Sequence, residues 1–281
     1  MRALDHKLCA ASPSAFFLAV ARRIYAEGWC REYISHIDFS SVEKLAAEVS
    51  DISPRFYETI LLRKRMVRYL VEQLLEQHPR HQVCILAAGL DPLGLQIAEN
   101  YYQQVDSIYE IDNAFVREKQ ELYSAISFND DRLFNLHIDI RNPALMMQTL
   151  IDAGYLPCEP TLIVFEGIMQ YMSEEHFLRI MRAFCSRTRN NAVIMDYALP
   201  VEDLPSSFAS ETREIVDRME EAMGQRVRHY SRKKILNLLS LLEAEIFDVY
   251  DMRAAEYVLN GQNNICHSRG EGMMEMVAFS I

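Results

Sequence analysis

The chain has 281 residues, of which 50% are apolar and 25% charged, a composition that excludes a disordered, collagen-like or coiled-coil protein. Its 40 acidic residues outnumber 29 basic ones, which gives a net charge of −11. Because phosphate binding needs a basic face, nucleic acid and anionic membranes are disfavoured as partners, whereas small cationic or zwitterionic ligands are compatible with the chain. The length fits either about two domains of ~150 residues or one enlarged core.

The cysteines and the first apolar stretch predict a reduced, cytoplasmic protein. Six cysteines are scattered singly, without a CxxC motif or a Cys/His pair at zinc spacing, so neither a disulfide framework nor a metal site is expected. The apolar stretch at 15–21 is short, ends at Arg22 and lacks a cleavage signature. We therefore expect no membrane partner.

The first eighty residues predict helices only. Pro13 opens a helix with apolar residues on one face, Ser40 or Ser41 can cap a short helix over 42–49, and Pro54 begins a long helix that runs to residue 77. No strand pattern interrupts them. We expect a helical cap over residues 1–80 that precedes the main fold, residues 81–281.

From residue 82 onward, short apolar runs alternate with stretches long enough for helices. The continuous apolar runs at 83–86 and 162–165 are typical of strands buried on both faces of a parallel sheet. This pattern predicts a Rossmann-like, doubly wound α/β fold. The strands expected in this region are 83–87, 107–111, 133–138, 161–165 and 192–196.

The alternation breaks after Asp196. Prolines, serines and a polar helix occupy an insertion at about 200–230, a place where insertions build the substrate side of a pocket, so we expect an inserted helical lid. Strand-like runs follow at 246–250 and 274–281, with no helix of regular length expected between them. The two runs should pair antiparallel, which predicts a seven-stranded sheet with an antiparallel C-terminal strand.

A glycine turn follows the first strand of this region. Gly89 would let the backbone approach a ligand, and the helix after it offers free N–H groups, as in nucleotide-binding loops. A phosphate-binding GxxxxGK[ST] loop is rejected because Leu95 and Gln96 replace its lysine and hydroxyl. A dinucleotide GxGxxG motif would need glycine at position 91, where the Asp91 carboxylate would repel a pyrophosphate.

Two carboxylates end the second strand. Glu110 lies 21 residues beyond Gly89, and Asp112 is two residues further, on the same side of the strand. An acid about 20 residues after such a turn accepts hydrogen bonds from ribose hydroxyls. A cofactor with a ribose but no phosphate, such as S-adenosylmethionine (SAM), satisfies both observations. A solvated strand end is the alternative.

Four segments together resemble, in order and spacing, the leucine carboxyl methyltransferase family, which includes protein phosphatase methyltransferases and bacterial O-methyltransferases of polyketide pathways. They are residues 85–91, 109–112, 139–140 and 164–172, within a resemblance that covers roughly residues 55–200. The resemblance implies a SAM-dependent O-methyltransferase that acts on a small molecule, at a carboxyl group, in secondary metabolism.

The resemblance also implies roles for individual residues. Arg63 would bind the SAM carboxylate, Glu166 would lie beside its amino group, and Tyr171 would lie near the acceptor. Asp139 and Ile140 would frame the adenine. Arg63 could instead be a solvated helix charge. The full set of expected cofactor-binding residues is Arg63, Gly89, Asp91, Glu110, Asp112, Asp139, Ile140 and Glu166.

The chain departs from the family at two places that concern the acceptor side. Pro92 and Leu93 follow Asp91 where bacterial relatives have threonine and arginine, and Arg68 stands where those relatives carry an acid. Neither change touches the sheet or the expected ribose site.

Methyl transfer from a sulfonium depends on positioning the acceptor, and no metal is expected. A carboxylate acceptor is already ionised at neutral pH, whereas a hydroxyl needs a general base; His137, His176, His229 and Tyr197 are candidates by position, and each could be structural. Tyr171 and Tyr197 are the residues we expect at the reaction centre. Two alternatives stay open: a cyclase that forms azetidine-2-carboxylate from SAM with release of methylthioadenosine, and a non-catalytic SAM-binding protein.

Overall fold

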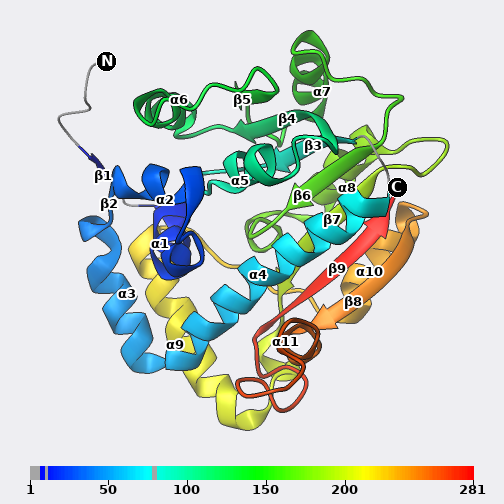
Figure 1. Cartoon of the computed structure of the whole chain (residues 1–281). Coiled ribbons are helices and arrows are strands. Elements are labelled where there is room, and N and C mark those ends of the chain that lie inside the picture. Colours follow the sequence, from blue (N-terminus) through cyan, green and yellow to red (C-terminus); the bar gives the residue numbers. More distant parts are fainter. Residues whose placement is uncertain (1–6, 10–11, 78–80) are drawn as a thin grey trace.

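The computed structural model describes residues 7–9, 12–77 and 81–281 (Figure 1). A seven-stranded sheet runs through its centre. The strands are β3 (His81–Leu86), β4 (Val105–Asp112), β5 (Leu133–His137), β6 (Thr161–Phe165), β7 (Ala192–Ala198), β8 (Glu245–Asp251) and β9 (Met274–Ser280). Their order across the sheet is β5-β4-β3-β6-β7-β9-β8.

The directions of the strands confirm the predicted doubly wound α/β fold. β9 pairs antiparallel with β7 and β8, and the other neighbouring pairs are parallel. β3, β6 and β9 are buried along their whole length, and β3 and β6 contain the continuous apolar runs at 83–86 and 162–165 that such burial predicts. The strand order reverses between β3 and β6, and ligands of open α/β sheets bind at the carboxyl ends of the strands beside such a reversal.

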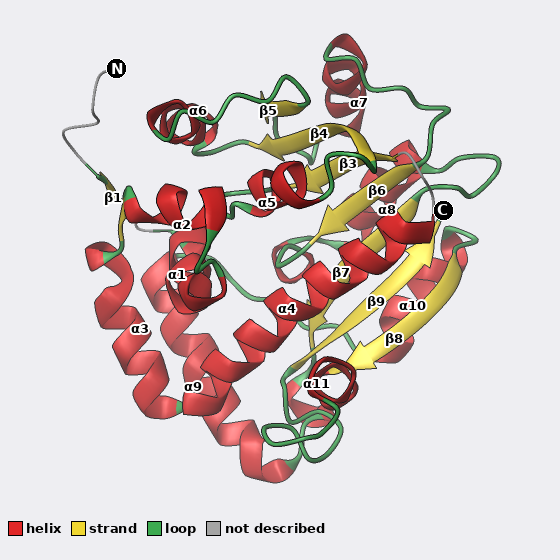
Figure 2. Ribbon diagram, in the orientation of Figure 1, coloured by secondary structure: helices red, strands yellow, loops and turns green. Residues whose placement is uncertain are grey.

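Helices cover both faces of the sheet. In Figure 2, α4 crosses in front of the sheet, while α8 and α10 lie behind it. α4, which the sequence prediction groups with the cap, packs on β6 and β7 and on α11. The helices that follow or precede strands are α4 (Pro54–Gln77), α5 (Leu93–Asn100), α6 (Val116–Ala125), α7 (Pro143–Asp152), α8 (Glu174–Phe184), α10 (Arg232–Leu241) and α11 (Met252–Asn260).

Further helices stand at the end of the sheet where β3 and β6 finish. They are α1 (Pro13–Ala21), α2 (Gly28–Ser35), α3 (Ser40–Ile52) and, from the insertion, α9 (Ser206–Met223). α3 packs on both α1 and α9, so segments far apart in the sequence lie side by side (Figure 1). Short helical turns occur at η1 (Arg22–Ile24), η2 (Met169–Tyr171) and η3 (Val201–Asp203).

Two local expectations are wrong. The N-terminal segment contains a two-stranded parallel ladder, β1 (Leu8–Cys9) with β2 (Ile37–Asp38), which is too short to give an alternating pattern. In addition, α11 separates β8 from β9. Asp251 accepts a hydrogen bond from the backbone N–H of Ala254 and caps its start, and Gly261, with φ of 71°, ends it in the left-handed region, so the signals of a helix were present in the sequence.

Candidate functional site

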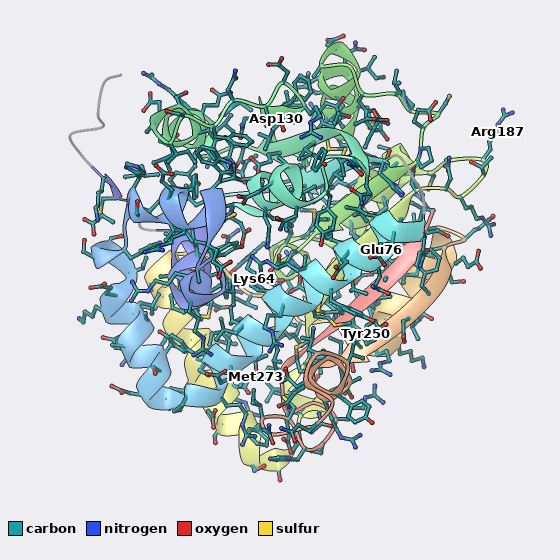
Figure 3. All side chains as sticks on the ribbon, viewed as in Figure 1. Lys64, Glu76, Asp130, Arg187, Tyr250 and Met273 are labelled. Atoms are coloured by element: carbon teal, nitrogen blue, oxygen red, sulfur yellow. The ribbon has the colours of Figure 1, made fainter. Side chains whose placement is uncertain are left out.

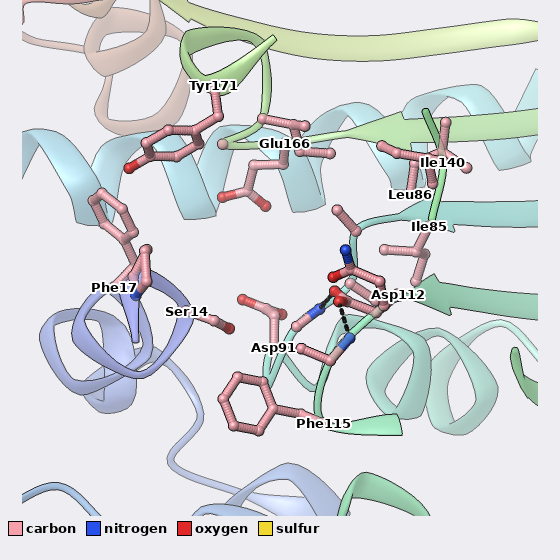
Figure 4. Close-up of a pocket in the computed structure, with 18 of the residues that line it drawn as sticks. Ser14, Phe17, Ile85, Leu86, Asp91, Asp112, Phe115, Ile140, Glu166 and Tyr171 are labelled. Atoms are coloured by element: carbon pink, nitrogen blue, oxygen red, sulfur yellow. Dashed lines mark hydrogen bonds between the residues drawn. The ribbon is translucent and has the colours of Figure 1, made fainter. Parts of the chain in front are cut away.

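A cavity of about 460 Å³, here called the main cavity, lies at the carboxyl ends of the strands. This volume falls within the range of about 300–1,000 Å³ that is usual for ligand pockets. The segments that follow β3, β4, β5 and β6 line one side, and the start of α1 lines the other. In Figure 4, Ser14 and Phe17 face the cavity from α1, and Asp91, Asp112 and Glu166 face it from the sheet.

The backbone around the main cavity contains several residues with positive φ. Ala87, Gly89, Phe115 and Gly167 all line the cavity and have φ of 49°, 52°, 57° and 72°. At Gly89 a Cβ atom would also collide with Oγ of Ser14. Such conformations cost energy for residues other than glycine, and they gather where a protein holds a ligand against its backbone.

Asp112 links the segment after β3 to the segment after β4 through hydrogen bonds. Its carboxylate accepts hydrogen bonds from the backbone N–H groups of Gly89, at 2.6 Å, and Ala114, at 2.8 Å. An ionised carboxylate offers about four acceptor positions, so further positions remain for a ligand in the cavity that Asp112 lines.

Glu110 does not line the main cavity, which corrects its predicted position beside the ribose. Its carboxylate is buried between α5 and α6, where it accepts hydrogen bonds from Lys119 Nζ at 2.8 Å and Tyr123 OH at 2.9 Å. Burial raises the pKa of Glu110. The two acids lie two residues apart on the same side of β4, as expected, but only Asp112, at the end of the strand, extends past the helices that cover Glu110.

A cluster of buried charges occupies the floor of the main cavity. Arg63 Nε lies 3.1 Å from Glu166 Oε1, and Arg63 Nη1 lies 3.4 Å from Asp196 Oδ2. Lys64 Nζ contacts Asp91 and lies 2.8 Å from Glu166 Oε1. Figure 3 shows Lys64 near the middle of the molecule, on α4. Arg63 is therefore not a solvated helix charge.

Two atoms of this cluster lack hydrogen bonds. Within the described residues, Arg63 Nε and Glu166 Oε1 are buried without a hydrogen-bond partner, although they attract each other as an ion pair. Buried polar groups in native proteins are almost always hydrogen-bonded, and these two atoms form an ion pair without an aligned hydrogen bond. A ligand that carries both a carboxylate and an ammonium group could supply the missing hydrogen bonds.

Asp91 is held by the protein itself. It accepts hydrogen bonds from Tyr25 OH at 2.7 Å, from the backbone N–H of Leu93 at 2.9 Å, and from Lys64. Burial opposes its ionisation, but the nearby cations Lys64 and Arg68 outweigh burial and hold its pKa below the usual value. Asp91 lines the main cavity, yet its carboxylate is largely engaged in fixing the turn to α4 and to the N-terminal helices.

Asp139, Ile140 and Tyr171 also line the main cavity. The carboxylate of Asp139 pairs with Arg141 at 2.6 Å near the surface, and that hydrogen-bonded cation lowers the pKa of Asp139. Burial raises the pKa of Tyr171 to about 12. At neutral pH its hydroxyl is therefore protonated and can donate a hydrogen bond.

Tyr197 does not line the main cavity, which corrects its predicted place at the reaction centre. It is fully buried on β7 and donates a hydrogen bond to Glu275 Oε2 at 2.6 Å. Arg232 holds the same carboxylate with two contacts of 2.8 Å. The side chains of successive strand residues alternate between faces, so Asp196 points to the site and Tyr197 points away.

A second, smaller pocket of about 70 Å³ lies beneath α9 and is here called the apolar pocket. It shares Phe17, Arg63 and Tyr171 with the main cavity, so the two spaces adjoin. His229 also lines the apolar pocket, and burial lowers the pKa of His229. The other lining residues are Phe56, Ile60, Gln170, Asp196, Ala198, Leu199, Thr212, Ile215, Val216, Met219, Val227, Met273 and Met274.

The sequence prediction missed Lys64 and the α1 residues at the main cavity, and Asp196 at the apolar pocket. Lys64 follows Arg63 directly, and Asp196 ends an expected strand, so both carried a signal. Ser14 and Phe17 come to the cavity only through the packing of α1 on α4, which no local pattern encodes. His176 and His137 line neither space, and His176 instead contacts Ser173 at the start of α8.

Residues 7–9, 12–77 and 81–281 contain neither a candidate metal site nor a candidate membrane span. No three His, Cys, Asp or Glu side chains are grouped there to hold a metal ion. No helix in that part of the chain is both long and apolar enough to cross a membrane.

Comparisons with known proteins agree with this fold. The sequence model of the leucine carboxyl methyltransferase family matches residues 9–185. A solved structure from Thermobifida fusca, assigned as a methyltransferase, is similar with a TM-score of 0.72 at 13% identity, over 96% of this chain and 94% of the other. A DUF574 family protein from Streptomyces avermitilis is similar with a TM-score of 0.66 at 13% identity, over 96% and 97%. No curated protein matches the sequence significantly.

Proposed function

Because the chain belongs to the leucine carboxyl methyltransferase family, we propose that it is a SAM-dependent O-methyltransferase that acts on a small molecule. Membership of the family confirms the resemblance seen in the sequence, and SAM is the cofactor. The acceptor, the carboxyl group predicted as its reacting group and a role in secondary metabolism belong to the proposal.

The observation that carries the proposal is the buried ion pair of Arg63 Nε and Glu166 Oε1, neither of which forms a hydrogen bond in the described chain. The methionine part of SAM carries a carboxylate and an ammonium group, which match a buried donor and a buried acceptor at one place. An arginine binds carboxylates well because its charge is permanent and its donors are planar. The residues of the main cavity therefore fit the cofactor.

The remaining lining residues extend this fit. Arg63 would hold the carboxylate, Glu166 the ammonium group, and Asp112 the ribose hydroxyls, while Asp139 and Ile140 would lie against the adenine. When bound, SAM supplies a methyl group on a sulfonium. The protein's own contribution is to bind and orient the two substrates and to exclude water from between them.

The apolar pocket supports methyl transfer over the two alternatives. An intramolecular cyclisation of SAM needs no second substrate, and a silent binding protein needs no acceptor site. Here a pocket adjoins the main cavity and shares Arg63 and Tyr171 with it, which is where an acceptor would have to lie.

The deciding experiment is to incubate the purified protein with SAM, alone and with a panel of carboxylic acids, phenols and alcohols, and to identify the nucleoside products by mass spectrometry. S-adenosylhomocysteine that forms only with an acceptor supports the proposal. Methylthioadenosine formed without any acceptor would favour the cyclase. Binding of SAM in calorimetry without turnover of any acceptor would favour the silent protein.

A further inference from the structure

Two side chains of the apolar pocket have polar atoms without partners. Gln170 is 7% exposed and Thr212 is 3% exposed, and both line the pocket. In the described part of the chain, neither Gln170 Oε1 nor Thr212 Oγ1 has a hydrogen-bond partner. Two unsatisfied polar atoms that line one mainly apolar pocket are available to bind a ligand there.

The chemistry of Gln170 restricts the ligand. Gln170 Nε2 donates a hydrogen bond of 2.8 Å to the carbonyl oxygen of Gly167, and this contact fixes which end of the amide is the oxygen. An amide oxygen only accepts hydrogen bonds. Its partner must therefore be a donor such as a hydroxyl, and an ionised carboxylate has no proton to donate.

Thr212 adds a second requirement that a ligand of the apolar pocket must meet. It projects from α9 into the pocket from the side of the insertion, whereas Gln170 comes from η2, after β6. A threonine hydroxyl can both donate and accept, so it can serve the oxygen lone pair of the same ligand group. One hydroxyl that donates to Gln170 and accepts from Thr212 would satisfy both atoms.

The charges around the pocket also disfavour an anion. Among the described lining residues, Arg63 is the one lysine or arginine, and it already pairs with Asp196, which lines the same pocket, and with Glu166. No unpaired cation of this described lining is left to replace the water around a carboxylate. Moving an uncharged group out of water costs much less free energy.

We propose that the apolar pocket binds the acceptor through an uncharged, mainly apolar part that carries a hydroxyl group. This hydroxyl would donate a hydrogen bond to Gln170 Oε1 and accept one from Thr212 Oγ1. This inference rests on the proposed function and restricts the part of the acceptor that the apolar pocket holds to a neutral group with a hydroxyl, of which a phenol is the simplest small example.

The test uses three probes that share a 4-ethylphenyl group: 4-ethylphenol, 4-ethylanisole, which lacks the O–H donor, and 4-ethylbenzoate, which is anionic. Binding to the whole chain is measured by calorimetry with the main cavity filled by S-adenosylhomocysteine. We expect 4-ethylphenol to bind about 10-fold more tightly than either of the others, since a site built to pair a hydroxyl discriminates against analogues that leave it unpaired. Equal binding of all three, preference for the benzoate, or binding of none would overturn the inference.

Variants identify the residues responsible. Gln170→Met and Thr212→Val should each reduce the preference for 4-ethylphenol over 4-ethylanisole to less than about 3-fold, in line with the loss of one hydrogen bond. Thr59→Val is the matched control, because Thr59 Oγ1 is equally buried and unpartnered in the described chain but lies outside the apolar pocket. Thr59→Val should keep the full preference. A loss of preference in this control would also overturn the inference.

The same calorimetry separates this inference from the proposed function. If SAM and S-adenosylhomocysteine fail to bind, the proposed function fails. If they bind normally and the probes show no preference for the phenol, only the inference about the acceptor fails.

Discussion

Asp112 accepts a hydrogen bond of 2.6 Å from the backbone N–H of Gly89, and this contact ties the turn after β3 to the end of β4. Loss of the carboxylate by Asp112→Ala should remove both the partner expected for the ribose and the brace of the turn. We expect SAM affinity, measured by calorimetry, to fall more than about 10-fold, because a charge-assisted hydrogen bond is lost. Asp112→Asn keeps one acceptor oxygen and should lose less. Unchanged affinity in the alanine variant would contradict the ribose assignment.

Gly89→Ala should damage the site through the backbone. The position has φ of 52°, and the new Cβ would collide with Ser14 of α1. The left-handed conformation alone costs about 1–2 kcal/mol, and the collision adds to it. Gly224→Ala is the control, since Gly224 has φ of 62° but no described atom within 4 Å of the place where the new methyl group would lie. In chemical denaturation and SAM titration, only Gly89→Ala should lose both stability and affinity.

Arg63→Met should abolish tight SAM binding and destabilise the protein. The change removes the buried cation that faces Glu166 and Asp196, so both carboxylates lose the ion pair with Arg63. Removing one partner of a buried ion pair typically costs about 3–5 kcal/mol. Arg65→Met, two residues along α4, removes only an exposed contact with Asn260 and serves as the control. Equal SAM affinity in the two variants would show that Arg63 does not hold the cofactor.

Glu110→Gln tests whether Glu110 lies outside the ribose site. Since the carboxylate pairs with Lys119 and lies outside the main cavity, we expect the free energy of unfolding to fall by about 3 kcal/mol, with SAM affinity within about 2-fold of the unchanged protein. Urea unfolding and calorimetry measure the two effects separately. A large loss of affinity in a fully folded variant would restore Glu110 to the cofactor site.

His229 should determine how kcat/KM falls at acid pH. Burial lowers its pKa from the usual value of about 6.5, and the opposing charges of Glu220 and Glu202 do not cancel this, so its ring is neutral at pH 7 and can take a proton from a hydroxyl acceptor. The value of kcat/KM should then fall as the pH drops through that lowered pKa. His229→Gln should lower kcat and remove this acidic limb. An unchanged profile would exclude His229 as the base.

The lowered pKa of His229 should also make the stability of the protein depend on pH. Because the pKa of His229 is lower in the folded protein, the unfolded chain binds the proton first as the pH falls below about 6.5. The protein should therefore lose stability towards acid pH from this group. Urea unfolding at pH 7.5 and pH 5.5 should show a smaller difference for His229→Gln than for the unchanged protein.

Local sequence patterns were sufficient to predict the fold and the family. The buried strands β3 and β6 are continuous apolar runs, and the turn at Gly89 with Asp112 after β4 lies at fixed spacing, so these patterns place the carboxyl ends of the strands together. Arg63 and Glu166 also stood in recognisable segments, and the structure brings them within 3.1 Å of each other.

Which of the candidate groups face the site depends on tertiary packing. Glu110 is covered by α6 and neutralised by Lys119, and Tyr197 points to the face where Glu275 lies, although both looked like site residues by position in the chain. Gln170 lies in segment 164–172 and Thr212 in the insertion, but their missing hydrogen bonds could not be predicted, because they depend on which groups lie nearby in space. Local patterns encode where a strand ends, whereas burial and pairing depend on segments that meet only in the folded chain.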